Sequence, residues 1–142
     1  MIIDDTSRRQ KAENSVGVVP QYASTLGKKA NCQTLVSMSQ ALREVPLMLF
    51  LPDIWTADTA CLKRTGVPLE HQGFRTKSEM AIEEIDRLCA AVVRFGCVLA
   101  DAGYGLSAPF RQTLSARNLR WAVGIPRHQK VCSDNVKLVF PA

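Results

Sequence analysis

The chain has 142 residues, 46% hydrophobic and 22% charged, and its formal net charge is +5. One domain is typical at this length, and the apolar share can fill a single core, which excludes a disordered protein. No apolar stretch, Leu47–Leu51 included, approaches the roughly 20 residues of a membrane span. Asp4 and Asp5 stand where a secretory signal would have lysines, so we expect neither an export signal nor membrane association.

The five cysteines are an odd number and include no CxxC pair. This usage argues against a disulfide framework and against a structural zinc site. Reduced thiols fit a cytoplasmic protein, and that is the location we expect.

Positive charge is concentrated in the last third of the chain, where Asp134 is the one acidic residue after Asp101. Such a region attracts a polyanion such as DNA, although a solubilising surface explains the same residues. The basic residues of this region are Arg111, Arg117, Arg120, Arg127, Lys130 and Lys137.

The first half of the chain has the pattern of β-structure. Met1–Asp5 predicts a short strand, and Ser15–Val19 a second one. Gln21–Ala30 is polar and predicts a turn or hairpin end. Apolar and polar residues alternate over Cys32–Ser39, which predicts a third strand, and the apolar run Leu47–Leu51 predicts a fourth.

A loop region around a short helix is expected over Asp53–Arg75, and a long helix follows it. Thr76 and Glu79 form the capping-box pattern, in which each side chain accepts a hydrogen bond from the other residue's backbone N–H. Gly96 is the expected stop of this helix. Its apolar face is expected to contain Ala81, Ile85, Leu88, Cys89 and Val92.

Strand and helix alternate in the remaining chain. Cys97–Ala100 predicts a central strand buried on both faces. Ser107 and Pro109 begin a second helix, with Phe110 and Leu114 one turn apart, that ends near Asn118. Further strands are expected over residues 121–125 and 136–140. A β-meander followed by βα units indicates an α/β domain, a ribonuclease H-like mixed sheet with flanking helices.

Acidic residues follow two of the apolar strands, and they suggest a metal site. Asp4 and Asp5 follow Ile2 and Ile3, and Asp101 follows the 97–100 run. Ligands gather beyond the carboxyl ends of parallel strands, and neighbouring strands lie about 4.8 Å apart, so these carboxylates could share Mg²⁺ or Mn²⁺. Two such ions support phosphodiester cleavage. Aspartates also cap strands and begin turns without binding a metal.

A series of motifs spanning the chain resembles the transposases of bacterial insertion sequences that have a DDE catalytic domain, in the group with IDDT and ADAGYG motifs. The motifs are IDDT (3–6), SVGVVPQYASTLGKKANCQ (15–33), LFLPDIWTAD (49–58), GVPLE (66–70), RTKSEMAIEEIDR (75–87) and VLADAGYG (98–105). The resemblance implies a ribonuclease H-like fold, two divalent ions (Mg²⁺ or Mn²⁺), DNA as substrate (transposon ends and target), and a homodimer.

The resemblance also assigns residues. It places the first catalytic Asp on Asp4, with Asp5 as the alternative, and the second on Asp101. All three are candidate metal ligands, although Asp5 could instead support the site. The glycines beside Tyr104 are expected to allow a tight turn next to the metal. The candidate DNA-binding residues are Lys28 and Lys29 in the polar block, where Asn31 and Gln33 also match, and Arg127 and Lys130 in the basic patch.

The chain also departs from this family pattern. The family has a third acid, usually Glu, downstream of the second, whereas here no Glu follows Glu84 and Asp134 is the one candidate. The first strand also has few residues before Asp4. We therefore expect residues 1–142 to be part of a transposase catalytic domain, truncated at both ends and inactive alone. The alternatives are a non-catalytic DNA-binding or assembly remnant and an unrelated α/β metal-dependent phosphatase.

Overall fold

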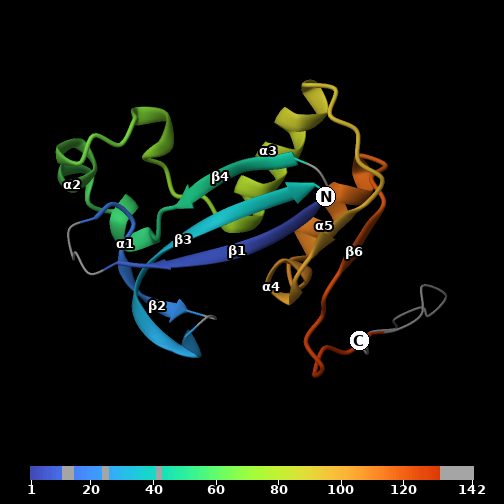
Figure 1. Ribbon diagram of the computed structural model, residues 1–142, viewed down its shortest axis with the longest axis horizontal. Coiled ribbons are helices and arrows are strands. Elements are labelled where there is room, and N and C mark those ends of the chain that lie inside the picture. The colour runs from blue at the N-terminus through green and yellow to red at the C-terminus, as the bar shows by residue number, and fades with distance from the viewer. Residues whose placement is uncertain (11–14, 24–25, 41–42, 132–142) are drawn as a thin grey trace, which may run out of the picture.

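The computed structural model describes residues 1–10, 15–23, 26–40 and 43–131. Within these residues six strands form one mixed sheet with flanking helices (Figure 1), so the expected α/β, ribonuclease H-like arrangement is confirmed. The expected strand at 136–140 and Asp134 lie outside the described residues. The elements are β1 (Ile2–Arg9), β2 (Val19–Ala23), β3 (Lys28–Gln40), β4 (Arg43–Phe50), α1 (Asp53–Thr56), α2 (Thr59–Arg64), the 3₁₀-helix η2 (Leu69–His71), α3 (Lys77–Ala90), β5 (Val98–Ala100), α4 (Ala102–Gly105), α5 (Ala108–Ala116) and β6 (Trp121–Val123).

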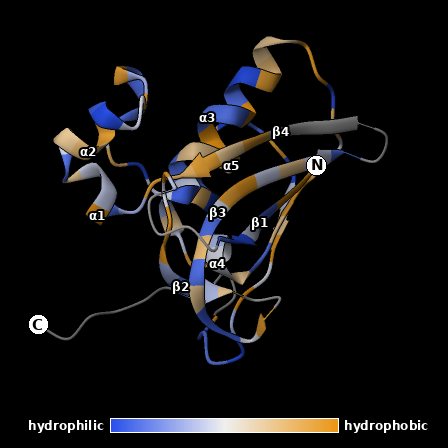
Figure 2. Cartoon of the chain, turned by 60° about the vertical axis from the view of Figure 1, so that its left-hand side comes forward, coloured by the Kyte–Doolittle hydropathy of each residue, from blue (hydrophilic) through white to orange (hydrophobic). Residues whose placement is uncertain are grey.

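The long strand β3 organises the sheet. It pairs antiparallel with β1 along one edge, and with β2 and then β4 along the other. The predicted alternation is confirmed, because Cys32, Thr34, Val36 and Met38 are each at most 3% exposed while the residues between them are not buried. Figure 2 shows bands of hydrophobic and hydrophilic residues along β3.

The first two strands differ from their predicted extents. β1 does not end at Asp5 but continues to Arg9, because all of its residues pair with β3. The second strand begins at Val19 and includes Pro20, whereas residues 15–17 form a turn. β2 lies at the edge of the sheet, where the missing N–H of a proline is tolerated. Most of the segment 21–30, expected as a turn, is therefore strand on both sides of Gly27.

Helix α3 has the predicted start but not the predicted end. Thr76 and Glu79 form the capping box, and the backbone N–H of Thr76 lowers the pKa of the Glu79 carboxyl. The helix ends at Ala90 because the N–H groups of Val92 and Val93 bond the carbonyls of Cys89 and Leu88. Gly96 is thus not the stop, and Cys89 and Val92 are exposed instead of facing the core.

One core lies between the sheet and the helices α3 and α5. It contains Ile3 and Val98 from the strands, Ile85 from α3, and Phe110 and Leu114 from α5. The second predicted helix is thereby confirmed, with Ser107 as its N-cap. No described helix is long and apolar enough to span a membrane.

The other face of the sheet is partly open among the described residues. Ile2, Leu47 and Leu99 are 50%, 60% and 42% exposed. The expectation that the 97–100 strand is buried on both faces is therefore wrong, because α3 and α5 cover one face of the sheet only.

Candidate active site

The strands β1 and β5 bring two of the predicted acidic residues together. They are neighbouring and parallel, and Ile3 pairs with Ala100. Asp4 and Asp101 each directly follow a residue of this pair. Asp101 ends its strand as expected, but Asp4 lies within β1, which continues along β3 after β5 has ended.

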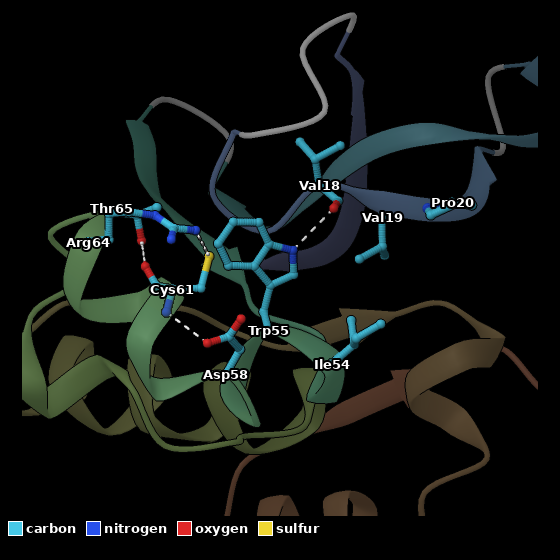
Figure 3. Close-up of a pocket in the computed structure, with 9 residues that line it drawn as sticks. All are labelled: Val18, Val19, Pro20, Ile54, Trp55, Asp58, Cys61, Arg64 and Thr65. Atoms are coloured by element: carbon cyan, nitrogen blue, oxygen red, sulfur yellow. Dashed lines mark hydrogen bonds between the residues drawn. The ribbon is translucent and has the colours of Figure 1, made fainter.

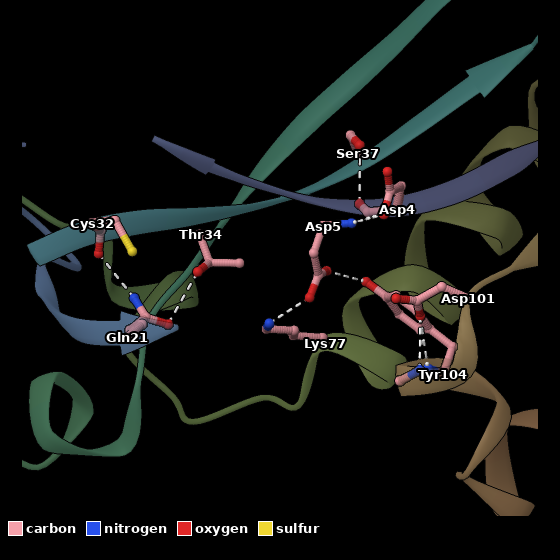
Figure 4. Close-up of polar contacts among 10 residues, drawn as sticks. Asp4, Asp5, Gln21, Cys32, Thr34, Ser37, Lys77, Asp101 and Tyr104 are labelled. Atoms are coloured by element: carbon pink, nitrogen blue, oxygen red, sulfur yellow. Dashed lines mark hydrogen bonds and ion pairs between the residues drawn. The ribbon is translucent and has the colours of Figure 1, made fainter. Parts of the chain in front are cut away.

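Asp4 and Asp5 point to opposite faces of the sheet, as neighbours in a strand do (Figure 4). Asp4 is exposed on the open face, and its backbone carbonyl accepts a hydrogen bond from the Ser37 hydroxyl at 2.9 Å. Asp5 lies on the same face as buried Ile3, toward the helices. The two carboxylates therefore have different surroundings.

Both oxygens of the Asp5 carboxylate have a side-chain partner. The Tyr104 hydroxyl donates to Oδ1 at 2.7 Å, and the Lys77 ammonium donates to Oδ2 at 2.5 Å. Lys77 is the first residue of α3 and Tyr104 lies in α4, so this contact joins three elements. The side chains of Lys77 and Asp5 are 33% and 27% exposed.

Asp101 is the N-cap of α4. Its Oδ1 accepts hydrogen bonds from the backbone N–H groups of Gly103 at 2.9 Å and Tyr104 at 3.3 Å. These are orphan donors of the helix start, and a charged acceptor is favoured there. The capping contacts hold an exposed carboxylate in a defined orientation beside β1.

The Tyr104 hydroxyl contacts one carboxylate and is influenced by the charges of two others. Burial raises the pKa of this phenol most, followed by its hydrogen bond to Asp5 and then the negative charges of Asp5, Asp101 and Asp4. Tyr104 is 3% exposed and packs on the Phe110 ring at a centroid distance of 5.6 Å. It is therefore a neutral hydrogen-bond donor that lies near all three acids.

The glycines of the second motif allow a close backbone approach. The expected tight turn is wrong, because residues 102–105 are helical and neither Gly103 nor Gly105 has a positive φ. A Cβ at Gly105 would lie 1.8 Å from the carbonyl oxygen of Gly124. A Cβ at Gly124 would lie 2.9 Å from the backbone nitrogen of Ala102. Two glycines thus let the segment after β6 pack directly against α4.

The donor set of Asp4 and Asp101 fits a hard divalent cation. Both carboxylates are exposed, and within the described residues each uses only Oδ1 as a hydrogen-bond acceptor. Asp5 fits less well, because its two oxygens already accept hydrogen bonds from Lys77 and Tyr104. No group of three or more His, Cys, Asp or Glu side chains able to hold a metal ion occurs in the described part of the chain. Asp134 lies outside that part.

Four basic residues lie at the other end of β1. The predicted Lys28 and Lys29 begin β3 and are exposed, and β1 ends in exposed Arg8 and Arg9. We call these four residues the basic end. Sequence analysis missed Arg8 and Arg9, although adjacent arginines four residues after an aspartate pair are a visible signal.

The described basic residues of the last third divide into two sets, and Lys137 lies outside the described residues. Arg117 makes two hydrogen bonds to Asp86, at 2.6 and 2.7 Å, and this contact lowers the pKa of the Asp86 carboxyl. Arg111 and Arg120 donate to the backbone carbonyls of Gly105 and Gly96. Arg127 and Lys130, the predicted DNA-binding residues, are exposed.

Sequence analysis also missed the contacts of Lys77 and Tyr104 with Asp5. A lysine directly after a capping threonine has no chemical signature of its own, and Tyr104 is 99 residues from Asp5. The alternation of side chains in β1 does indicate that Asp5 faces the core side. A polar partner for Asp5 could have been expected from that alone.

A cavity of about 620 Å³ lies apart from these acids, between α1, α2 and the start of β2 (Figure 3). The polar groups that line it already make hydrogen bonds within the fold. The Trp55 ring N–H donates to the Val18 carbonyl at 3.1 Å, and Asp58 caps α2 by accepting from the Cys61 N–H at 2.8 Å. This cavity therefore adds no catalytic group.

Comparison with known proteins identifies one family. A family model described as DDE superfamily endonuclease matches residues 1–142. No curated protein and no solved structure matches the chain significantly.

Proposed function

The chain belongs to the DDE superfamily endonucleases, and from this premise we propose that it contains the catalytic core of an insertion-sequence transposase. Endonucleases of this superfamily are divalent-metal dependent and cleave DNA. The observation that best supports the proposal is the pairing of β1 with β5. It puts the backbones of Asp4 and Asp101 next to paired residues of neighbouring parallel strands, which supports a metal ion shared by their carboxylates.

Asp4 and Asp101 would hold the metal, which is Mg²⁺ or Mn²⁺ in this proposal. When bound, it lowers the pKa of a coordinated water or hydroxyl and stabilises the leaving oxygen of a phosphodiester. Asp101 is oriented by the backbone N–H groups of α4, and Asp4 by its place in the paired strand. Asp5 remains the alternative first ligand.

The basic end and the open face of the sheet would bind the DNA backbone. Side-chain alternation puts Arg8 on the same face as Asp4, about 13 Å away at four residues of strand. Lys29 lies on a neighbouring strand at the same end of the sheet. A strand of DNA held there by its phosphates could extend toward the carboxylates. Arg127 and Lys130 are further candidate contacts, and transposon ends and target DNA are the proposed substrates.

A complete site of this type needs a third acid, which the described residues do not provide. We therefore propose that the 142-residue chain binds one metal weakly and does not cleave DNA alone. A homodimer on paired DNA ends is part of the proposal. The alternative is a non-catalytic DNA-binding or assembly remnant, which would keep the basic end without a need for metal binding.

The test measures Mn²⁺ binding by electron paramagnetic resonance and nicking of supercoiled DNA, with the wild-type chain, Asp101→Asn, and Asp53→Asn as control. Asp53 is also an exposed aspartate beside a helix start. We expect Mn²⁺ binding by the wild type and the control, its loss in Asp101→Asn, and no nicking by any of them. Wild-type binding that Asp101→Asn leaves unchanged would contradict the metal site. Metal-dependent nicking would contradict the proposal that a third metal ligand is missing. Asp134→Asn would then be the next variant to test.

A further inference from the structure

The hydrogen bond between Tyr104 and Asp5 connects the two segments that contain the proposed metal ligands. Asp5 is the chain neighbour of Asp4 on β1. Tyr104 lies in the single helical turn that Asp101 caps, and its own N–H is one of the groups bound by Asp101. A shift of α4 relative to β1 would therefore break the contact between the Tyr104 hydroxyl and Asp5 (Figure 4).

Lys77 holds the same carboxylate from a third element. The capping box of Thr76 and Glu79 fixes the first turn of α3, where Lys77 is the first residue. The Lys77 ammonium also lies 5.3 Å from the centroid of the Phe50 ring on β4, within the range of a cation–π contact. Its position is thus defined by the helix start, an aromatic ring and Asp5.

Stability alone explains this arrangement poorly. A partly exposed ion pair contributes about 0–1 kcal/mol. A carboxylate on the core-facing side of a strand is costly unless it is paired, whereas an apolar residue there would simply extend the core. Departures from local rules of this kind occur at functional sites.

We propose that Lys77, Asp5 and Tyr104 are positioning residues that fix the Asp4 and Asp101 carboxylates relative to each other. The inference rests on the proposed function, in which those two residues bind the metal. In this proposal Asp5 supports the two ligands and does not bind the metal itself, because each of its oxygens already accepts a hydrogen bond from a side chain. Groups that orient metal ligands without touching the metal change its affinity about 10–100-fold when removed.

The test uses Tyr104→Phe and Lys77→Met, with Tyr22→Phe and Lys63→Met as controls at exposed positions on β2 and α2. The first measurement is backbone amide exchange in the metal-free chain. We expect faster exchange at Gly103, whose N–H is bound by Asp101, relative to the amides of α5. A role in overall stability would accelerate both sets together. The second measurement is the Kd for Mn²⁺, which should rise about 10-fold in the two variants and not in the controls.

Folded variants with unchanged Gly103 exchange and an unchanged Kd for Mn²⁺ would overturn the proposal. If Tyr104→Phe does not fold, Lys77→Met decides, because its side chain is partly exposed and outside the core. If the wild-type chain binds no Mn²⁺, the metal site of the proposed function fails. The exchange at Gly103 then still shows whether these residues position Asp101.

Discussion

The two halves of β1 contain opposite charges in different surroundings. Asp4 and Asp5 lie where β5, α3 and α4 meet, and Asp5 bonds two side chains. Arg8 and Arg9 lie where, among the described residues, β1 pairs with β3 but no longer with β5, and both are exposed. In the proposed function, the first half contributes to a cation site and the exposed charges of the second half contact the phosphate backbone. One strand thus combines paired acidic residues at one end with exposed basic residues at the other.

The largest expected effect is a difference in Mn²⁺ affinity between variants of Asp4 and Asp5. Asp4→Asn should weaken Mn²⁺ binding by on the order of 100-fold or more, because it removes a proposed ligand, and Asp5→Asn by about 10-fold, because it removes a supporting group. Calorimetric titration with Mn²⁺ measures both, and Asp53→Asn is the control. The reverse ranking would make Asp5 the ligand.

A smaller effect is expected for Gly105→Ala, which disturbs the acidic end through the backbone. The added Cβ would meet the Gly124 carbonyl at 1.8 Å, so α4 must move. Overpacking of this kind costs about 1–3 kcal/mol. Denaturant unfolding should show a lower free energy of unfolding, and Mn²⁺ binding should weaken with it. Gly73→Ala is the control, since its Cβ would meet nothing within 4 Å. Equal stability of both variants would contradict the close approach.

The basic end should respond differently, with losses in DNA affinity that depend on salt. Replacing Arg8 and Lys29 together with glutamine should raise the Kd for duplex DNA several-fold and lower the salt slope by about one per lost phosphate contact. Fluorescence anisotropy at several salt concentrations measures this. Lys63→Gln on α2 is the control, and Mn²⁺ binding should not change. A salt slope equal to that of the wild type would exclude the basic end as the DNA surface.

The smallest expected effect concerns Val92, which lies outside β1. It tests whether the free energy of unfolding can change while Mn²⁺ and DNA binding stay the same. Val92 has a φ of 60°, which is unfavourable for a β-branched residue. Val92→Gly should raise the free energy of unfolding by about 1 kcal/mol. Mn²⁺ and DNA binding should stay as in the wild type. Thermal unfolding provides the measurement, and a destabilised variant would show that the Val92 side chain contributes packing despite being 75% exposed.

Much of the fold could be predicted because its signals are local. The alternation in β3 and the capping boundaries of α3 and α5 depend on residues within a few positions of one another. The IDDT and ADAGYG motifs likewise indicated the acids and the family. Where local signals were misleading, a strand pairing or an unusual backbone conformation was responsible. β1 continues past Asp5 because β3 pairs with it, and α3 ends early because Val92 adopts a positive φ.

The amino-acid sequence by itself determined most of the elements, the family and the candidate acids, since periodicity, capping and motifs are properties of neighbouring residues. The tertiary structure alone decided what those acids contact. Asp5 meets Tyr104 from 99 residues away and Lys77 from 72. Gly105 meets Gly124 because β6 lies beside β5. Such contacts depend on which strands pair and which helix covers them, and a chain does not encode that order in any short stretch of its residues.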